Sequence, residues 1–416
     1  MIYYINSVTK MKKREIVLIN ITGEDKPGLT SSLTAILAQY KVNILDIGQA
    51  VIHEQLSLGI LIELPHETSS SPVLKDILFR AYELKVGVKF TPIVEESYSQ
   101  WVNHQGKDRF IVTVISRRIT ANQLSKVTFE IYNQGLNIEQ ISRLTGRLPL
   151  QESGLIEKAS VEFSVRGLPK SIDQMRKRFM EISHETGCDI ALQRDNIFRR
   201  NRRLVCFDMD STLIQTEVIV ELAKLAGVGE QVHEITEAAM RGELDFNKSF
   251  IKRIALLKGL DVSVMSNIAE KLPITEGAER LFRTLKKYGF KTAILSGGFN
   301  YFGKYLQHKL GVDYLFANEL EIVDGKLTGK HVGDIVNGEM KAEWLRKIAF
   351  KEDIHLEQTV AVGDGANDLP MINIAGLGIA FHAKPKVKEI AQQAISTIGL
   401  DAVLYLMGFR DREIEY

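Results

Sequence analysis

The chain has 416 residues, 45% of them apolar and 25% charged, with a formal net charge of +1, so two or three ordinary globular domains are expected. The near-neutral charge argues against nucleic acid or an anionic membrane surface as a partner, and no apolar run approaches the roughly 18 residues of a membrane span. The two cysteines, Cys188 and Cys206, argue against a disulfide framework and favour a reducing compartment, so we expect a cytoplasmic protein.

Residues 14–96 predict a βαββαβ unit. The stretch EIVLINIT is an apolar-rich strand candidate, and the loop GEDKPG separates it from a helix whose apolar positions recur at i, i+3, i+4 and i+7. These positions are Leu33, Ile36, Leu37 and Tyr40. Two further strands, a second helix and a closing strand near VGVKFTPIV complete the order.

Residues 108–196 repeat this order of elements, from FIVTVIS to the helix SIDQMRKRFMEISHETG. The phrases VNI and LNI place Asn43 and Asn137 at corresponding positions, and the second copy carries about ten extra residues between its middle strands. A diverged internal duplication is therefore favoured over two unrelated α+β segments.

The basic stretch FRRNRR, residues 198–203, leads into the rest of the chain. A nucleic-acid patch is one interpretation, but a solvated interdomain linker is favoured. From Leu204 onward strands and helices alternate, the pattern of a mostly parallel sheet with helices on both faces. We therefore expect a third domain over residues 203–410.

Two aspartates follow the first strand of this domain. The segment LVCF is short and continuously apolar, as a strand buried on both faces should be, and Asp208 and Asp210 fall at its carboxyl end, where the crevice of such a sheet lies. Positions i and i+2 of an extended segment share a face. Two carboxylates about 5 Å apart repel by about 3 kcal/mol at an effective dielectric of 20, so a divalent cation or a shared proton is required. The alternative is that Asp210 only caps the following turn.

Two later strands also end in polar residues. KTAILSGGF ends in Ser296 and Gly297, whose hydroxyl and backbone N–H groups suit phosphate oxygens, although an ordinary glycine turn is the alternative. TVAVGDGAND places acidic and amide groups on a glycine-rich loop: Asp364, Asn367 and Asp368. Oxygen ligands from two strand ends suit Mg²⁺, and no Cys/His spacing indicates zinc.

The motifs D-x-D-x-T, S-G-G, K (Lys341) and G-D-G-x-N-D, in this order, resemble those of the haloacid dehalogenase-like (HAD) hydrolases. The resemblance implies an α/β fold, a Rossmannoid parallel sheet with a small helical cap over about residues 216–282. It implies that Asp208 is the nucleophile that becomes an aspartyl-phosphate and that Asp210 is the general acid and base. The implied Mg²⁺ ligands are Asp208, the backbone carbonyl of Asp210, and Asp364, with Asp368 and Asn367 orienting them. Ser296, Gly297 and Lys341 would hold the phosphoryl oxygens.

Within that superfamily the segment from Leu204 to residue 408 is most similar to the phosphoserine phosphatase family. The similarity implies that Glu217 binds the substrate ammonium, that Arg253 binds its α-carboxylate, and that Met240 and Phe246 flank the lid. The chemistry is consistent, because an amino-acid phosphate requires an anion, a guanidinium fork and an apolar cover.

Each amino-terminal block resembles the ACT domain, a ferredoxin-like α+β module that senses amino acids. The first block matches through DKPG at residues 25–28, whereas the second departs from the pattern, with RRITANQ from Arg117, which puts a second ligand site in doubt. The resemblance implies an amino-acid effector and a homodimer paired through these domains.

Three functions are compatible with these patterns. The first is Mg²⁺-dependent hydrolysis of phosphoserine, the last step of serine biosynthesis. The second is a phosphatase or phosphotransferase that acts on another small phosphoester, for example with homoserine as acceptor. The third is an amino-acid sensor without catalysis. The presence of every residue of the motifs favours an enzyme, and Glu217 with Arg253 favours an amino-acid ester.

Overall fold

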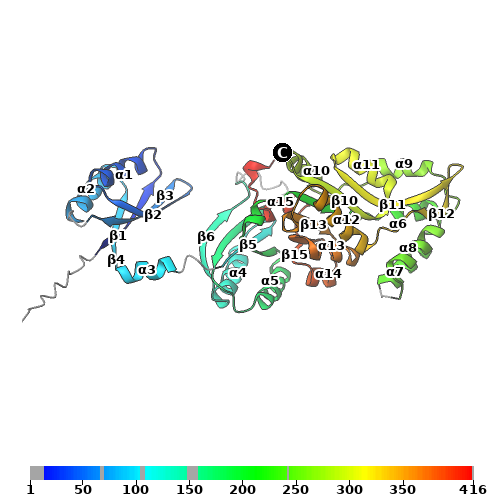
Figure 1. The fold of residues 1–416 in the computed structure, drawn as a ribbon, viewed down its shortest axis with the longest axis horizontal. Helices are drawn as coiled ribbons and strands as arrows, with labels where there is room; N and C mark the ends of the chain where they lie inside the picture. Colours follow the sequence, from blue (N-terminus) through cyan, green and yellow to red (C-terminus); the bar gives the residue numbers. More distant parts are fainter. Residues whose placement is uncertain (1–13, 66–69, 104–107, 148–157, 241–242, 415–416) are drawn as a thin grey trace, which may run out of the picture. The chain divides into compact units, whose positions relative to one another are not determined.

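The computed structural model describes residues 14–414 except 66–69, 104–107, 148–157 and 241–242 (Figure 1). The chain divides into two compact units, Met1–Lys107 and Asp108–Tyr416. None of the helices in the described part of the chain is both long enough and apolar enough to cross a membrane.

The first unit holds one four-stranded antiparallel sheet in the order β2-β3-β1-β4. Leu33 on the first helix and Ile77 on the second are buried against Ile19 and Ile60 of the sheet. The elements are β1 Glu15–Glu24, α1 Leu29–Gln39, β2 Asn43–Ile52, β3 Gln55–Leu64, α2 Ser70–Glu83 and β4 Gly87–Ile93, followed by α3 Glu95–Asn103.

The second unit begins with a domain of the same topology, whose sheet has the order β6-β7-β5-β8. The strand after the first helix starts at Asn43 in one copy and at Asn137 in the other, and both strands shift register after their second residue, Ile44 and Ile138. The duplication is therefore confirmed. The elements are β5 Arg109–Ser116, α4 Ala121–Asn133, β6 Asn137–Arg143, β7 Ala159–Arg166, α5 Ile172–Thr186 and β8 Asp189–Arg194.

The remainder of the second unit is built on a seven-stranded sheet in the order β12-β11-β10-β9-β13-β14-β15, parallel except at β12. Its strands are β9 Leu204–Phe207, β10 Lys291–Phe299, β11 Tyr314–Val323, β12 Lys326–Val332, β13 Thr359–Gly363, β14 Leu377–Phe381 and β15 Gln393–Ile395. The central strand β9 is buried on both faces, because Val205 and Phe207 enter one apolar core while Leu204 and Cys206 enter the other. The predicted α/β fold class is confirmed.

Helices cover both faces of this sheet (Figure 1). Those outside the cap are α10 Ala278–Lys287, α11 Asn300–Leu310, α12 Gly338–Lys351, α13 Leu369–Ile374, α14 Pro385–Ile390 and α15 Ala402–Leu406.

The cap consists of four helices inserted after β9: α6 Val218–Leu225, α7 Gly229–Met240, α8 Phe246–Ala255 and α9 Ser263–Glu270. The chain leaves and returns through an antiparallel bridge between Ile214 and Ile274. The chain thus returns from the cap before the expected boundary at residue 282. Helix α10 already packs on the sheet, since the ring centroids of Phe282 and Phe207 of β9 lie 4.9 Å apart.

The stretch 198–203 is solvated only in part, because Arg200, Asn201 and Arg203 are exposed whereas two other arginines are buried. Arg199 is 3% exposed and forms an ion pair with Glu162 of β7. Arg202 is 8% exposed and donates to the carbonyl oxygens of Glu357 and Gly376. Arg199 thus anchors this stretch to the second domain of the duplication, and Arg202 anchors it to the seven-stranded domain.

Candidate active site

Three neighbouring strands of the seven-stranded sheet bring polar residues to one edge. Asp208 and Asp210 follow β9, Ser296 lies near the end of β10, and Asp364 follows β13. Because β9 pairs with both β10 and β13 in parallel, these carboxyl ends meet. The backbone N–H of Asp208 donates to Val362 O at 2.9 Å, which continues the strand pairing to the first catalytic candidate.

An acidic cluster occupies this edge. One carboxylate oxygen from each of Asp208, Asp364 and Asp368 lies within 4.8 Å of the others. Lys341 is fully buried, and its Nζ donates to Asp208 Oδ1 and Asp368 Oδ1, each at 2.6 Å. One lysine therefore faces three carboxylates, which leaves an excess of negative charge that suits a cation with oxygen ligands.

Burial and mutual repulsion change the acidity of this cluster. Burial raises the pKa of Asp208, and the nearby charge of Asp368 raises it further. The pKa of Asp364 is raised by burial and then by Asp368 and Asp208. Burial alone would lower the pKa of Lys341, but attraction to Asp208 and Asp368 outweighs that effect and raises it. The lysine is thus held as a cation.

Asp210 lies beside this cluster in a different environment. Its Oδ1 accepts a hydrogen bond from the backbone N–H of Val218 at 2.9 Å, and Gly298 leaves space for its other oxygen, since a Cβ there would collide with Asp210 Oδ2. Burial, followed by the charge of Asp208, raises the pKa of Asp210 to about 8. A carboxyl group that retains its proton near neutral pH is suited to protonate a leaving group.

The turn after β10 provides donors at the same edge. Ser296 is buried, and its Oγ accepts a hydrogen bond from Gly298 N at 2.9 Å. Asn318 on β11 fixes the turn, because its Nδ2 donates to Gly297 O at 2.8 Å and its Oδ1 accepts from Val336 N at 2.8 Å. A Cβ at Gly297 would lie 2.7 Å from Cζ of Phe246, so a side chain there would displace that ring.

A cavity of about 700 Å³ lies between this edge and the cap. Its core side includes Asp208, Asp210, Gly297, Asp364 and Asn367, and its cap side includes Glu217, Phe246, Ser249, Phe250 and Arg253. The described part of the cap therefore contributes the carboxylate of Glu217 and the guanidinium of Arg253 to the same space. Burial lowers the pKa of Arg253, whereas the charges of Glu217 and Asp210 raise it, with a net lowering.

The structure thus brings most of the predicted residues to one cavity. Ser296, Lys341 and Asp368 lie behind its surface, where Lys341 and Asp368 contact Asp208 and each other. Met240 ends α7, but its side chain lies outside the described part of the chain.

Sequence reasoning missed some residues at this site. The fully buried Thr212 has its Oγ1 3.5 Å from Asp364 Oδ1, and its place as the threonine of D-x-D-x-T was a usable signal. Ser249 lies on α8 one helical turn before Arg253. Because residues four apart share a helix face, this spacing in the sequence was also a usable signal. Asn318 had no comparable signal, because only the pairing of β11 with β10 brings it to Gly297.

Comparisons with known proteins agree with this architecture. Residues 202–376 match the haloacid dehalogenase-like hydrolase family, and residues 15–91 and 109–193 each match an ACT domain family. The fold and the site thus define the class as an HAD-like hydrolase preceded by two ACT domains.

Relatives of similar length match nearly the whole chain. A phosphoserine phosphatase of Streptomyces coelicolor is 40% identical over 96% of this chain and 93% of its own, and one of Mycobacterium tuberculosis is 40% identical over 97% and 96%. A solved structure, a probable phosphoserine phosphatase from Vibrio cholerae, matches 72% of this chain and 86% of its own at 38% identity, with a TM-score of 0.57. The chain belongs to the phosphoserine phosphatase family and is a phosphatase.

Proposed function

We propose that this phosphatase hydrolyses O-phospho-L-serine to L-serine and phosphate with Mg²⁺, through an aspartyl-phosphate on Asp208. The observation that carries the proposal is the composition of one cavity. Its core side has a nucleophile candidate beside a proton-holding carboxyl, and its cap side has Glu217 and Arg253, opposite charges that match the ammonium and carboxylate of an amino acid.

The reaction proceeds in two displacements at phosphorus. In the first, a carboxylate oxygen of Asp208 bonds to phosphorus while the bond to the serine oxygen breaks, and Asp210 gives its proton to that oxygen. In the second, Asp210 takes a proton from water, whose oxygen displaces Asp208 and releases phosphate. Ser296, the N–H of Gly297 and Lys341 would hold the phosphoryl oxygens in both steps.

The acidic cluster fits Mg²⁺. Asp208, Asp364 and the backbone carbonyl of Asp210 would hold the ion, and Asp368, whose Oδ2 accepts from Gly365 N at 2.9 Å, would orient the loop that carries Asp364. The bound ion would neutralise charge on the phosphoryl oxygens. The excess of three carboxylates over one lysine supports this assignment.

The ACT domains support regulation by an amino acid and a homodimer paired through the first domain. Strand β2 forms an edge of the first sheet, and it exposes Ile47 and Ile52. In the second sheet the corresponding edge strand, β6, also exposes an apolar residue, Ile141, but the central strand β5 is buried after Arg109 and contacts α15 of the phosphatase domain. Calorimetric titration of the full chain with serine and other amino acids tests the effector, and a monomer in sedimentation experiments would contradict the dimer.

The decisive test is phosphate release from L-phosphoserine, with and without Mg²⁺, by the wild type and by Asp208→Asn. We expect release only by the wild type with metal. Equal rates in the two proteins would remove Asp208 as the nucleophile. A faster reaction on a sugar phosphate, or transfer to homoserine rather than water, would assign another substrate or acceptor, and no turnover of any phosphoester would favour a sensor.

A further inference from the structure

Helix α8 carries two unsatisfied donors on residues that line the active-site cavity. Ser249 is 1% exposed, and its Oγ has no hydrogen-bond partner among the described residues, nor has Nε of Arg253. Both residues line the cavity. Residues four apart are neighbours on one face of a helix, so the hydroxyl and the guanidinium lie one turn apart on the same wall.

The unsatisfied hydroxyl is unusual for its position. A serine or threonine inside a helix commonly donates to a carbonyl one turn earlier. Thr236 on α7 lines the same cavity and does so, with its Oγ1 2.8 Å from Val232 O. At Ser249 the preceding carbonyl, Asp245 O, accepts from the backbone N–H at 3.0 Å, and the hydroxyl donates to none of the described residues. Since buried polar groups are almost always hydrogen-bonded, the Ser249 hydroxyl is available to a ligand.

The two donors together indicate the chemistry of that ligand. The Arg253 guanidinium can only donate, and a carboxylate has two oxygens that can only accept. Glu217 would attract an ammonium group, so the wall at α8 is suited to the anionic end of an amino acid. A carboxylate placed there can accept from the guanidinium with one oxygen and from the serine hydroxyl with the other.

We propose that Ser249 is a specificity-determining residue whose hydroxyl donates to the substrate carboxylate beside Arg253. This inference rests on the proposed function, because it concerns the amino-acid part of phosphoserine. The hydroxyl fixes the orientation of the carboxylate about the guanidinium. It therefore favours phosphoserine over phosphoesters that lack this group and has no part in the chemistry at phosphorus.

The test compares kcat and KM of the wild type and Ser249→Ala on phosphoserine, phosphoethanolamine and p-nitrophenyl phosphate, with Mg²⁺. Alanine keeps the packing and removes only the hydroxyl. We expect kcat/KM for phosphoserine to fall about tenfold, the effect of one hydrogen bond, mainly through KM. The other two substrates, which lack a carboxylate, should change less than about twofold. The control is Ser266→Ala on α9, an exposed serine whose hydroxyl donates to Ser263 O at 2.8 Å.

Each other outcome overturns the inference in a distinguishable manner. Wild-type kinetics of Ser249→Ala on phosphoserine would show that the position requires only a small side chain. Equal losses on all three substrates would assign Ser249 to the structure of the cap. A loss shared by phosphoserine and phosphoethanolamine alone would place the hydroxyl at the ammonium. Failure of the wild type itself to hydrolyse phosphoserine would overturn the proposed function, and this inference with it.

Discussion

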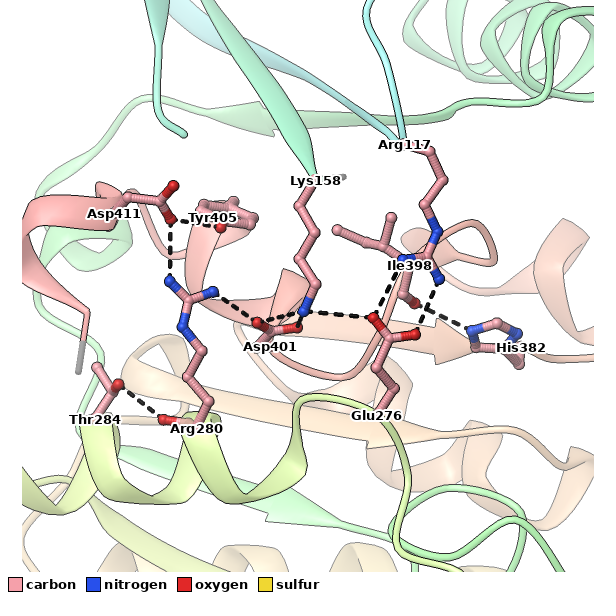
Figure 2. A network of polar contacts seen from close by, with 10 residues as sticks. All are labelled: Arg117, Lys158, Glu276, Arg280, Thr284, His382, Ile398, Asp401, Tyr405 and Asp411. Carbon is pink, nitrogen blue, oxygen red and sulfur yellow. Dashed lines mark hydrogen bonds and ion pairs between the residues drawn. The ribbon is translucent and has the colours of Figure 1, made fainter. Parts of the chain in front are cut away.

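Arg117 of the second ACT domain donates two hydrogen bonds to Glu276 of the phosphatase domain, from Nη1 at 3.2 Å and from Nη2 at 2.9 Å (Figure 2). Glu276 lies two residues after Ile274, which closes the bridge to the cap, and directly before Gly277, the N-cap of α10. The second ACT domain therefore contacts the phosphatase domain where the chain returns from the cap.

A buried anion lies next to this ion pair. Asp401 is completely buried, and it accepts from Lys158 Nζ at 2.8 Å and from Arg280 Nη1 at 2.8 Å. Gly277 has φ 81° and makes the close approach possible, since a Cβ there would collide with Asp401. Lys158 belongs to the ACT side and Arg280 to α10, so one carboxylate joins the two domains.

We predict that Asp401→Ala lowers the free energy of unfolding by about 3 kcal/mol, because it leaves Lys158 and Arg280 without their shared buried anion. Chemical denaturation measures the change. The matched control is Arg117→Ala in the same network, whose ion pair is partly exposed and should contribute less than about 1 kcal/mol. Equal effects of the two substitutions would contradict the importance of burial.

Glu276 should make part of the stability depend on acid. The hydrogen bond from Arg117 is the largest cause that lowers the pKa of Glu276 below its ordinary value of 4.5. A carboxylate with a lowered pKa in the folded state contributes stability that is present above 4.5 and is lost as the pH falls through the folded value. The difference in unfolding free energy between the wild type and Glu276→Gln should therefore decrease as the pH falls below about 4.5. A difference independent of pH over that range would refute the assignment.

The parts of the structure predicted from the sequence are those governed by local pattern. The buried strand before Asp208 and the glycine-rich loop at Asp364 are each visible as an apolar run that ends in acids, and parallel pairing then brings the strand ends together. The burial of Arg202 and the pair between Arg117 and Glu276 had no such signal. Their partners are more than 150 residues away, so only the packing of one domain on another determines them.

Arg253 should discriminate between substrates by their carboxylate. We predict that Arg253→Ala raises KM for phosphoserine by about 100-fold, as expected for the loss of a charge-assisted pair, and raises KM for p-nitrophenyl phosphate by less than about threefold. The neighbouring Lys252→Ala is the control, because Lys252 is exposed. Steady-state kinetics on both substrates measure the ratio, and proportional losses on both would refute a carboxylate clamp.

The acidic cluster should lower stability when no metal is present. Burial and the charges of Asp368 and Asp208 raise the pKa of Asp364, so its ionised form opposes folding at neutral pH. We predict that Asp364→Asn stabilises the protein in chelator by about 1 kcal/mol, since it removes one of three mutually repelling carboxylates. The same substitution should abolish the rise in Tm that Mg²⁺ gives the wild type, because the ion stabilises only the folded state that binds it. Asp334→Asn, at an exposed position, controls for the change in net charge and should retain the response to Mg²⁺. Lower stability of Asp364→Asn in chelator would show that Asp364 has a structural role. An unchanged response to Mg²⁺ would show that Asp364 does not bind the ion.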